Sequence, residues 1–154
     1  MPLVSRFVAL VPPPEVRAAI RALLPSAPQV RWTAPAQWHV TLRFLGQADP
    51  PDLAAIAQGT APFTLAVRGA GRFDDRVLWA ALAGETDRLH ALAAALGAAD
   101  YRPHLTLGFG SGLSPLVTAL RELRTPPWTV REIVLFRSER GVYSPLGSWA
   151  LSGP

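Results

Sequence analysis

The sequence contains no cysteine, lysine or asparagine, and few charged residues of any kind. Without cysteine, the chain can form no disulfide bond, offers no thiol nucleophile and cannot build a cysteine metal site. Its apolar runs are shorter than the roughly 18 uncharged residues that mark a membrane-spanning helix. Residues 1–14 do not have the shape of a secretory signal, because no basic residue precedes the apolar run and Arg6 interrupts it. We therefore expect a cytoplasmic protein without a membrane partner.

The charge that is present is mostly positive. All 15 basic residues are arginine, 11 residues are acidic, and the formal net charge is +4. This balance favours an anionic partner such as a nucleic acid or a phosphate ester. The length of 154 residues and the hydrophobic content of 49% predict one compact domain over residues 1–154 with a sizeable core. We expect it to be a monomer.

The order of β-forming segments, prolines and glycines predicts a mixed protein. Strands are expected at 5–12, 30–33, 39–46, 63–73, 77–84, 104–110, 128–139 and 147–153, and helices at 13–25, 50–59, 85–97 and 114–123. Gly69 and Gly71 suggest a bulge or bend, and Ser114 is the expected cap of the last helix. This order predicts an α+β fold of two similar lobes, with antiparallel or mixed sheets and helices packed outside.

One short pattern occurs twice, about 65 residues apart, in "HVTLRFLG" (39–46) and "HLTLGFG" (104–110). Two of the chain's three histidines stand in it. Alternate side chains of a strand share a face, so each strand should bury one apolar face and present an imidazole and a hydroxyl on the other. The polar faces would carry His39, Thr41 and Arg43, and His104 and Thr106; the apolar faces would carry Val40, Leu42 and Phe44, and Leu105, Leu107 and Phe109.

Two such strands brought together would form a cleft with two imidazoles and two hydroxyls. A neutral imidazole can take a proton from water, an imidazolium can give one to a leaving oxygen, and both forms exist near neutral pH. Threonine hydroxyls can donate to phosphoryl oxygens. The set can open a phosphodiester without a metal or any other cofactor. A zinc site is the weaker interpretation, because only two candidate ligands are present.

The other candidate residues carry less information. Arg43 and Arg102 flank the two motifs, where they could bind phosphate or simply be solvated at strand ends. His90 lies on an expected helix without a threonine partner, so we interpret it as structural and partly exposed. The aromatic residues are expected mostly in the core, although one could stack on a base; they include Phe7, Trp32, Trp38 and Tyr143.

The paired motifs, with "RFVALVPP" near the start and "FRSERGVYSPLGSWAL" near the end, resemble the 2H phosphoesterase superfamily. Within it they are similar to the RNA 2′,3′-cyclic phosphodiesterases, formerly called 2′-5′ RNA ligases. The resemblance spans essentially the whole chain and implies a bilobal α+β fold with both motif strands facing a central cleft. It implies metal-free hydrolysis of a terminal RNA 2′,3′-cyclic phosphate to a 2′-phosphate.

Residue by residue, the resemblance implies that His39 is the proton donor to the departing 3′ oxygen and His104 the proton acceptor that activates water. Thr41 and Thr106 would hold the phosphoryl oxygens. Ser138 and Tyr143 match positions of the closing segment, but the resemblance gives them no chemistry.

Three other functions stay open. The substrate could be a small cyclic phosphate, such as a cyclic nucleotide or a cyclic ADP-ribose derivative. The protein could join tRNA halves by a 2′-5′ bond. It could also be a non-enzymatic module that binds RNA ends, but a binder has no need of two titrating groups.

Overall fold

The computed structural model describes residues 4–154; residues 1–3, part of the opening segment considered above, lie outside it. Its helices are α1 (Pro14–Leu23), η1, a 3₁₀ turn (Pro35–Gln37), α2 (Leu53–Gln58), α3 (Thr86–Ala95) and α4 (Ser114–Ala119). Its strands are β1 (Ser5–Leu10), β2 (Val30–Trp32), β3 (Val40–Gly46), β4 (Phe63–Phe73), β5 (Val77–Gly84), β6 (Leu105–Gly110), β7 (Trp128–Val130), β8 (Glu132–Glu139) and β9 (Val142–Ala150).

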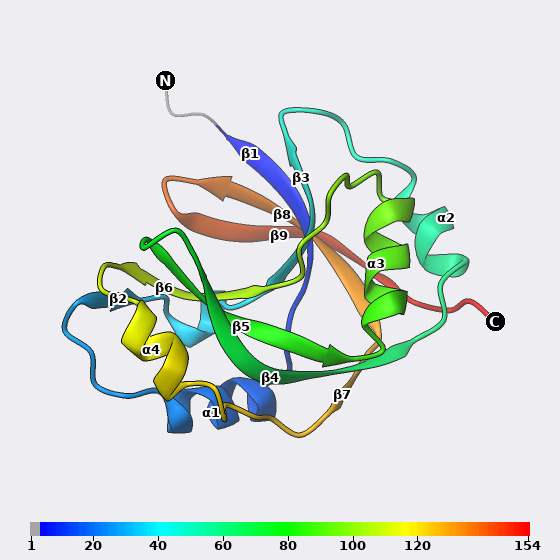
Figure 1. Ribbon diagram of the computed structural model, residues 1–154. Coiled ribbons are helices and arrows are strands. Elements are labelled where there is room, and N and C mark those ends of the chain that lie inside the picture. The colour runs from blue at the N-terminus through cyan, green and yellow to red at the C-terminus, as the bar shows by residue number, and fades with distance from the viewer. Residues whose placement is uncertain (1–3) are drawn as a thin grey trace.

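The strands form one curled antiparallel sheet in the order β7-β4-β5-β6-β3-β1-β8-β9, with β2 added beside β6. Its two halves meet where β3 pairs with β6, at Val40 and Leu105. The helices lie outside the strands (Figure 1): α4 packs on β4, α2 on β9 and α3 on β3. The predicted α+β fold with helices packed outside is therefore confirmed; of the two arrangements expected for the strands, antiparallel or mixed, the structure has the antiparallel one, in a single sheet. No helix among residues 4–154 combines the length and the apolar character that a membrane crossing requires.

The strand expected at 128–139 is wrong as a single element, because the chain leaves it at Arg131. Arg131 and Glu132 are both exposed, which breaks the alternation of buried and exposed residues. The segment before the break, β7, pairs with β4 at one edge of the sheet. The segment after it, β8, pairs with β1 in the other half. One apolar stretch of the sequence therefore contributes a strand to each half of the sheet.

The cap expected at Ser114 is also wrong. Ser114 is the first helical residue of α4, and its side chain makes no capping hydrogen bond. The Asp75 carboxylate, from the turn between β4 and β5, accepts hydrogen bonds from the backbone N–H groups of Gly112 and Leu113, both at 2.8 Å. These two donors lower the pKa of Asp75, and the contact holds the two residues that directly precede α4.

A bulge in β3 overturns part of the expected strand pattern. β1 pairs with β3 at Thr41 and at Arg43, so Leu42 is an extra residue between them. Because a bulge shifts the alternation by one, Phe44 is turned outward and is 65% exposed, while Leu45 is buried. The prediction that Phe44 shares the buried face is wrong.

The second motif strand bulges at the equivalent residue. β5 pairs with β6 at Thr106 and at Gly108, so Leu107 is the extra residue. Phe109 is consequently 44% exposed instead of buried as expected. Gly108 lies so close to β2 that a Cβ there would approach the Arg31 carbonyl oxygen to 2.7 Å. The bend expected near Gly69 is confirmed by an irregular register between Val67 and Ala70 in β4.

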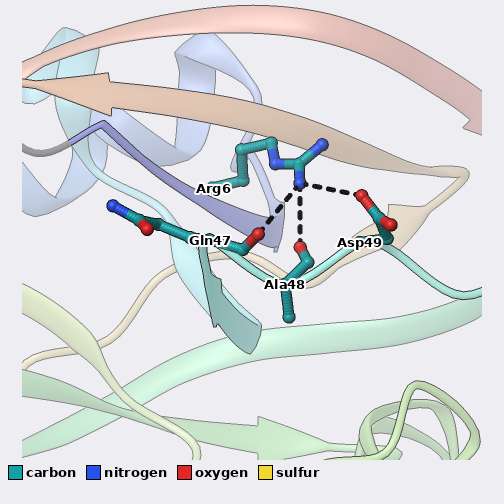
Figure 2. Close-up of polar contacts among 4 residues, drawn as sticks. All are labelled: Arg6, Gln47, Ala48 and Asp49. Carbon is teal, nitrogen blue, oxygen red and sulfur yellow. Dashed lines mark hydrogen bonds and ion pairs between the residues drawn. The ribbon is translucent and has the colours of Figure 1, made fainter.

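Arg6, near the start of β1, forms hydrogen bonds with the loop that follows β3 (Figure 2). Its Nη2 donates to the backbone oxygens of Ala48 at 2.9 Å and Gln47 at 3.5 Å, and lies 3.4 Å from Asp49 Oδ1. The Asp49 side chain is almost fully exposed, so the ion pair itself adds little stability. The backbone contacts hold the far end of the first motif strand.

Candidate active site

The two histidines stand at equivalent places in the fold. His39 directly precedes β3 and His104 directly precedes β6, and these strands pair antiparallel at Val40 and Leu105. Val40 and Leu105 are fully buried. Since neighbouring side chains of a strand point to opposite faces, each motif's histidine and threonine lie on the other face of the sheet. Both copies of the motif therefore meet at the junction of the two halves.

His39 is fixed by two hydrogen bonds and an aromatic cluster. Its Nδ1 lies 2.8 Å from the Gln37 carbonyl oxygen, and its Nε2 lies 3.1 Å from Thr41 Oγ1. A carbonyl oxygen can only accept, so Nδ1 carries a proton and Nε2 is left for proton transfer. The ring packs on Phe7 with a centroid distance of 4.9 Å and meets the Tyr143 ring edge-on at 5.4 Å.

Burial lowers the pKa of His39 from its ordinary value. The hydrogen bond to the Gln37 carbonyl opposes this shift, and the charge of His104 lowers the pKa further. The neutral form of His39 is therefore favoured in the free protein. The two histidines therefore lie close enough for the charge of His104 to act on His39.

His104 repeats the arrangement. Its Nδ1 lies 2.7 Å from the carbonyl oxygen of Arg102, two residues earlier, as Gln37 is for His39. Its ring meets Phe73 edge-on at 4.8 Å and lies 6.2 Å from Trp79. The same tautomer argument leaves Nε2 free. Each motif thus presents one imidazole with a fixed orientation and an aromatic support.

A pocket of about 710 Å³ opens on this face; we call it the main pocket. It joins residues from both motifs with residues from the β4–β5 turn and the loop before β6. Its lining includes Thr41, Arg43, Phe44, Phe73, Asp74, Tyr101, Arg102 and His104. His39 lines a separate, smaller cavity of about 200 Å³ together with Phe136 and Tyr143, and this cavity shares no lining residue with the main pocket. The volume of the main pocket suits a nucleotide-sized ligand.

The structure brings five of the six site residues expected from the sequence to the rim of these cavities. Thr106 is the exception: it is half-buried, pairs opposite Trp79 of β5, and lines neither cavity. Arg102 is exposed at the main pocket. Arg43 is partly engaged, because its Nη1 donates to the Gly97 carbonyl oxygen. Its Nε is buried without a partner in the described part of the chain.

The remaining expectations concern aromatic residues and His90. Phe7 and Trp38 are buried and Trp32 is half-buried, as expected for core positions. His90 is exposed on α3. Tyr143 pairs with Ser138 across the β8–β9 hairpin, which brings the closing segment beside His39.

Sequence reasoning missed Tyr101. Its hydroxyl donates a 2.7 Å hydrogen bond to the backbone oxygen of Thr41, 60 residues away. Burial raises the pKa of this hydroxyl, so it stays a donor at neutral pH. Together with the Arg43 contact to Gly97, this bond ties the loop that carries His104 to the strand that carries Thr41. No local pattern could have revealed it.

Replacing Tyr101 by phenylalanine should lower kcat up to about tenfold, the equivalent of one neutral hydrogen bond. The ring stays in place, but the backbone of Thr41 loses its tie to the loop before His104. Steady-state kinetics at several pH values would show a lower kcat without displaced limbs, because Tyr101 itself does not titrate near neutrality. A Tyr101→Phe variant with native kcat and native melting temperature would remove the residue from this role.

Among residues 4–154, no three His, Asp or Glu side chains gather as a candidate metal site. The two motifs, at 39–46 and 104–110, contain two histidines and no carboxylate. Metal-free catalysis nevertheless stays a prediction until it is assayed.

Comparison with known proteins gives a consistent result. A family model described as the 2′-5′ RNA ligase superfamily matches residues 12–142. An RNA 2′,3′-cyclic phosphodiesterase of Geobacillus stearothermophilus is 30% identical over 138 residues, covering 73% of this chain and 44% of that protein. This chain therefore spans less than half the length of that relative.

Two further proteins are similar over more of their length. An RNA 2′,3′-cyclic phosphodiesterase of Methanothermobacter thermautotrophicus is 28% identical over 144 residues, covering 77% of this chain and 78% of that protein. The crystal structure of Escherichia coli LigT complexed with NADP+ superposes with a TM-score of 0.72 at 27% identity, covering 99% of each chain. The curled antiparallel fold is thus shared along the whole chain.

Proposed function

This chain belongs to the 2′-5′ RNA ligase superfamily, and from that premise we propose that it hydrolyses the terminal 2′,3′-cyclic phosphate of RNA to a 2′-phosphomonoester. One observation carries the proposal. Two imidazoles, each oriented by a carbonyl two residues earlier, stand at the junction of β3 and β6 with Nε2 available for proton transfer. The relatives named RNA 2′,3′-cyclic phosphodiesterase supply the substrate class.

The proposed reaction is one in-line displacement at phosphorus. His104 Nε2 takes a proton from water while the water oxygen bonds to phosphorus on the side opposite the 3′ oxygen. The bond between phosphorus and the 3′ oxygen breaks, and protonated His39 gives its proton to that oxygen. Thr41 and Thr106 donate hydrogen bonds to the non-bridging oxygens, where charge concentrates. One water is consumed, and the 2′ ester bond stays intact.

The lowered pKa of His39 bears on this assignment, because a proton donor must be protonated when the substrate reacts. In the free protein, burial favours neutral His39. A bound phosphodiester is an anion, and an opposite charge nearby stabilises the imidazolium and raises its pKa. Substrate binding itself would thus charge the donor.

The function is tested by incubating the protein with an oligoribonucleotide that ends in a 2′,3′-cyclic phosphate, in buffer containing EDTA. We expect hydrolysis at an unchanged rate and a product with its phosphate on the 2′ oxygen, located by phosphorus NMR. A His39→Ala, His104→Ala double variant purified in the same way controls for contaminating nucleases. Activity that disappears with EDTA and returns with a divalent ion would refute the metal-free mechanism.

A further inference from the structure

The main pocket continues into a second cavity. This cavity has a volume of about 470 Å³ and shares Phe73 and Asp74, at the end of β4 and the β4–β5 turn, with the main pocket. A ligand that fills the main pocket beside His104 can therefore extend past this turn without leaving the surface. A single mononucleotide would not need the added space.

Three side chains of the second cavity form what we call the Phe109 platform: Phe109, Arg31 and Arg76. Phe109 is 44% exposed, because the bulge at Leu107 turns it outward. The guanidinium carbon of Arg31 lies 5.8 Å from the centre of the Phe109 ring. Neither arginine forms a salt bridge within the described residues, so both charges are available to an anion.

An exposed aromatic ring beside unpaired cations is the chemistry that binds single-stranded nucleic acid. The ring stacks on a base of any identity, and the cations contact the backbone phosphate. Asp74, the carboxylate at the shared rim, would repel phosphate and direct the backbone towards the arginines. Phe109 also lies on β6, the strand that begins directly after His104, so the platform is rigidly placed relative to the motif.

We propose that the Phe109 platform binds the nucleotide preceding the one that carries the cyclic phosphate, which makes a single-stranded RNA end the preferred substrate over a free cyclic mononucleotide. This inference rests on the function proposed above and deepens it. The terminal nucleoside occupies the main pocket, the base before it stacks on Phe109, and the phosphate between them lies near Arg31 and Arg76.

Another explanation is purely structural. Arg31 and Phe109 are paired residues of β2 and β6, and their contact could serve only to hold these strands together. Such a role would affect stability and all substrates equally. The two explanations therefore differ in whether substrate length matters.

The test compares kcat/KM for a cyclic-phosphate-ended tetraribonucleotide with kcat/KM for a 2′,3′-cyclic mononucleotide. In the native protein we expect the longer substrate to be preferred. Phe109→Ala should reduce the ratio of the two values by about tenfold, since one lost base–aromatic stack has an effect of this order. Phe109→Trp should preserve the ratio. Leu146→Ala, at an exposed apolar residue of β9, is the matched control and should leave it unchanged.

The charges are tested in the same way. Arg31→Gln should weaken the preference for the longer substrate and flatten its dependence on salt, whereas Arg121→Gln, at an exposed arginine beside Glu122, should not.

Equal kcat/KM for the two substrates, or an equal loss on both in Phe109→Ala, would overturn the inference while leaving the proposed function intact. If the native protein hydrolyses neither substrate, the proposed function fails. In that case, fluorescence anisotropy measures how tightly a 3′-phosphorylated tetranucleotide binds to the native protein and to Phe109→Ala. Binding that Phe109→Ala leaves unchanged would reject the Phe109 platform as a nucleotide site.

Discussion

Replacing His39 or His104 by alanine is expected to lower kcat on a cyclic-phosphate-ended RNA by about 10²–10⁴-fold, the usual contribution of a positioned general acid or base. The two residues should act as a unit, because one proton leaves water while another reaches the 3′ oxygen in the same displacement. The double variant should therefore lose much less than the product of the two single losses. Steady-state hydrolysis by the three variants measures this directly.

The pH dependence separates the two roles. The native rate should rise and then fall between about pH 5 and about pH 9, because one histidine must be neutral and the other charged. Without its proton acceptor, His104→Ala should keep only the falling limb, which belongs to the donor. Since burial lowers the pKa of His39, the donor loses its proton at a lower pH than an exposed histidine does. In kcat/KM, which reports the free protein, that fall should therefore be centred below about pH 6.5.

His39→Ala should show the opposite profile, a residual rate that rises with pH and stays high. If the two variants exchange these profiles, His39 is the acceptor and His104 the donor. His90→Ala is the control, because His90 is exposed on α3 and lies outside both cavities. Circular dichroism establishes that each variant is folded. A folded His39→Ala or His104→Ala protein with near-native turnover would contradict two-histidine catalysis.

The sequence alone predicted that both histidines lie on the face opposite the buried side chains of their strands, because strand periodicity is a local property. His39 and His104 precede residues that are fully buried, and the apolar runs made that burial predictable. The pattern failed at Phe44 and Phe109, two residues beyond each bulge. A bulge is an extra residue in one strand of a pair, so it depends on the partner strand. The partner strands here are β1 for β3 and β5 for β6. Both partners lie outside the local sequence of the motif and become neighbours only in the folded protein.

The contacts that complete the site are non-local for the same reason. Tyr101 reaches the backbone of Thr41 across 60 residues, and Asp75 binds the start of α4 across 37 and 38 residues. Ser114 carried a strong local signal for a helix cap, yet α4 already begins at Ser114, and Asp75 binds the amides of the two residues before it. Local patterns therefore predicted most of the side chains that gather at the candidate site, while tertiary contacts decide how these side chains are held.

Removing the hydroxyl of Thr41 or Thr106 is the other change for which we expect a large loss of kcat. A well-placed donor to a developing oxyanion typically contributes about 10²–10³ in kcat, so Thr41→Val should lose activity on this scale. Valine has a similar shape and suits a strand, so the fold should persist. Thr41 also bonds to His39 Nε2 at 3.1 Å, so its hydroxyl orients the imidazole in addition to the role proposed for it at the phosphate.

Serine variants provide the matched control for the threonine pair, since Thr41→Ser and Thr106→Ser keep the hydroxyl and should keep most of the rate. The two valine variants then test the symmetry of the site. Thr41 lines the main pocket, whereas Thr106 lies beside it, opposite Trp79. If both valine variants lose turnover, the phosphoryl group is held from both motifs, as the repeated pattern implies. If Thr106→Val keeps its native kcat while Thr41→Val does not, the second threonine has no part in binding phosphate, and the first motif alone supplies the hydroxyl.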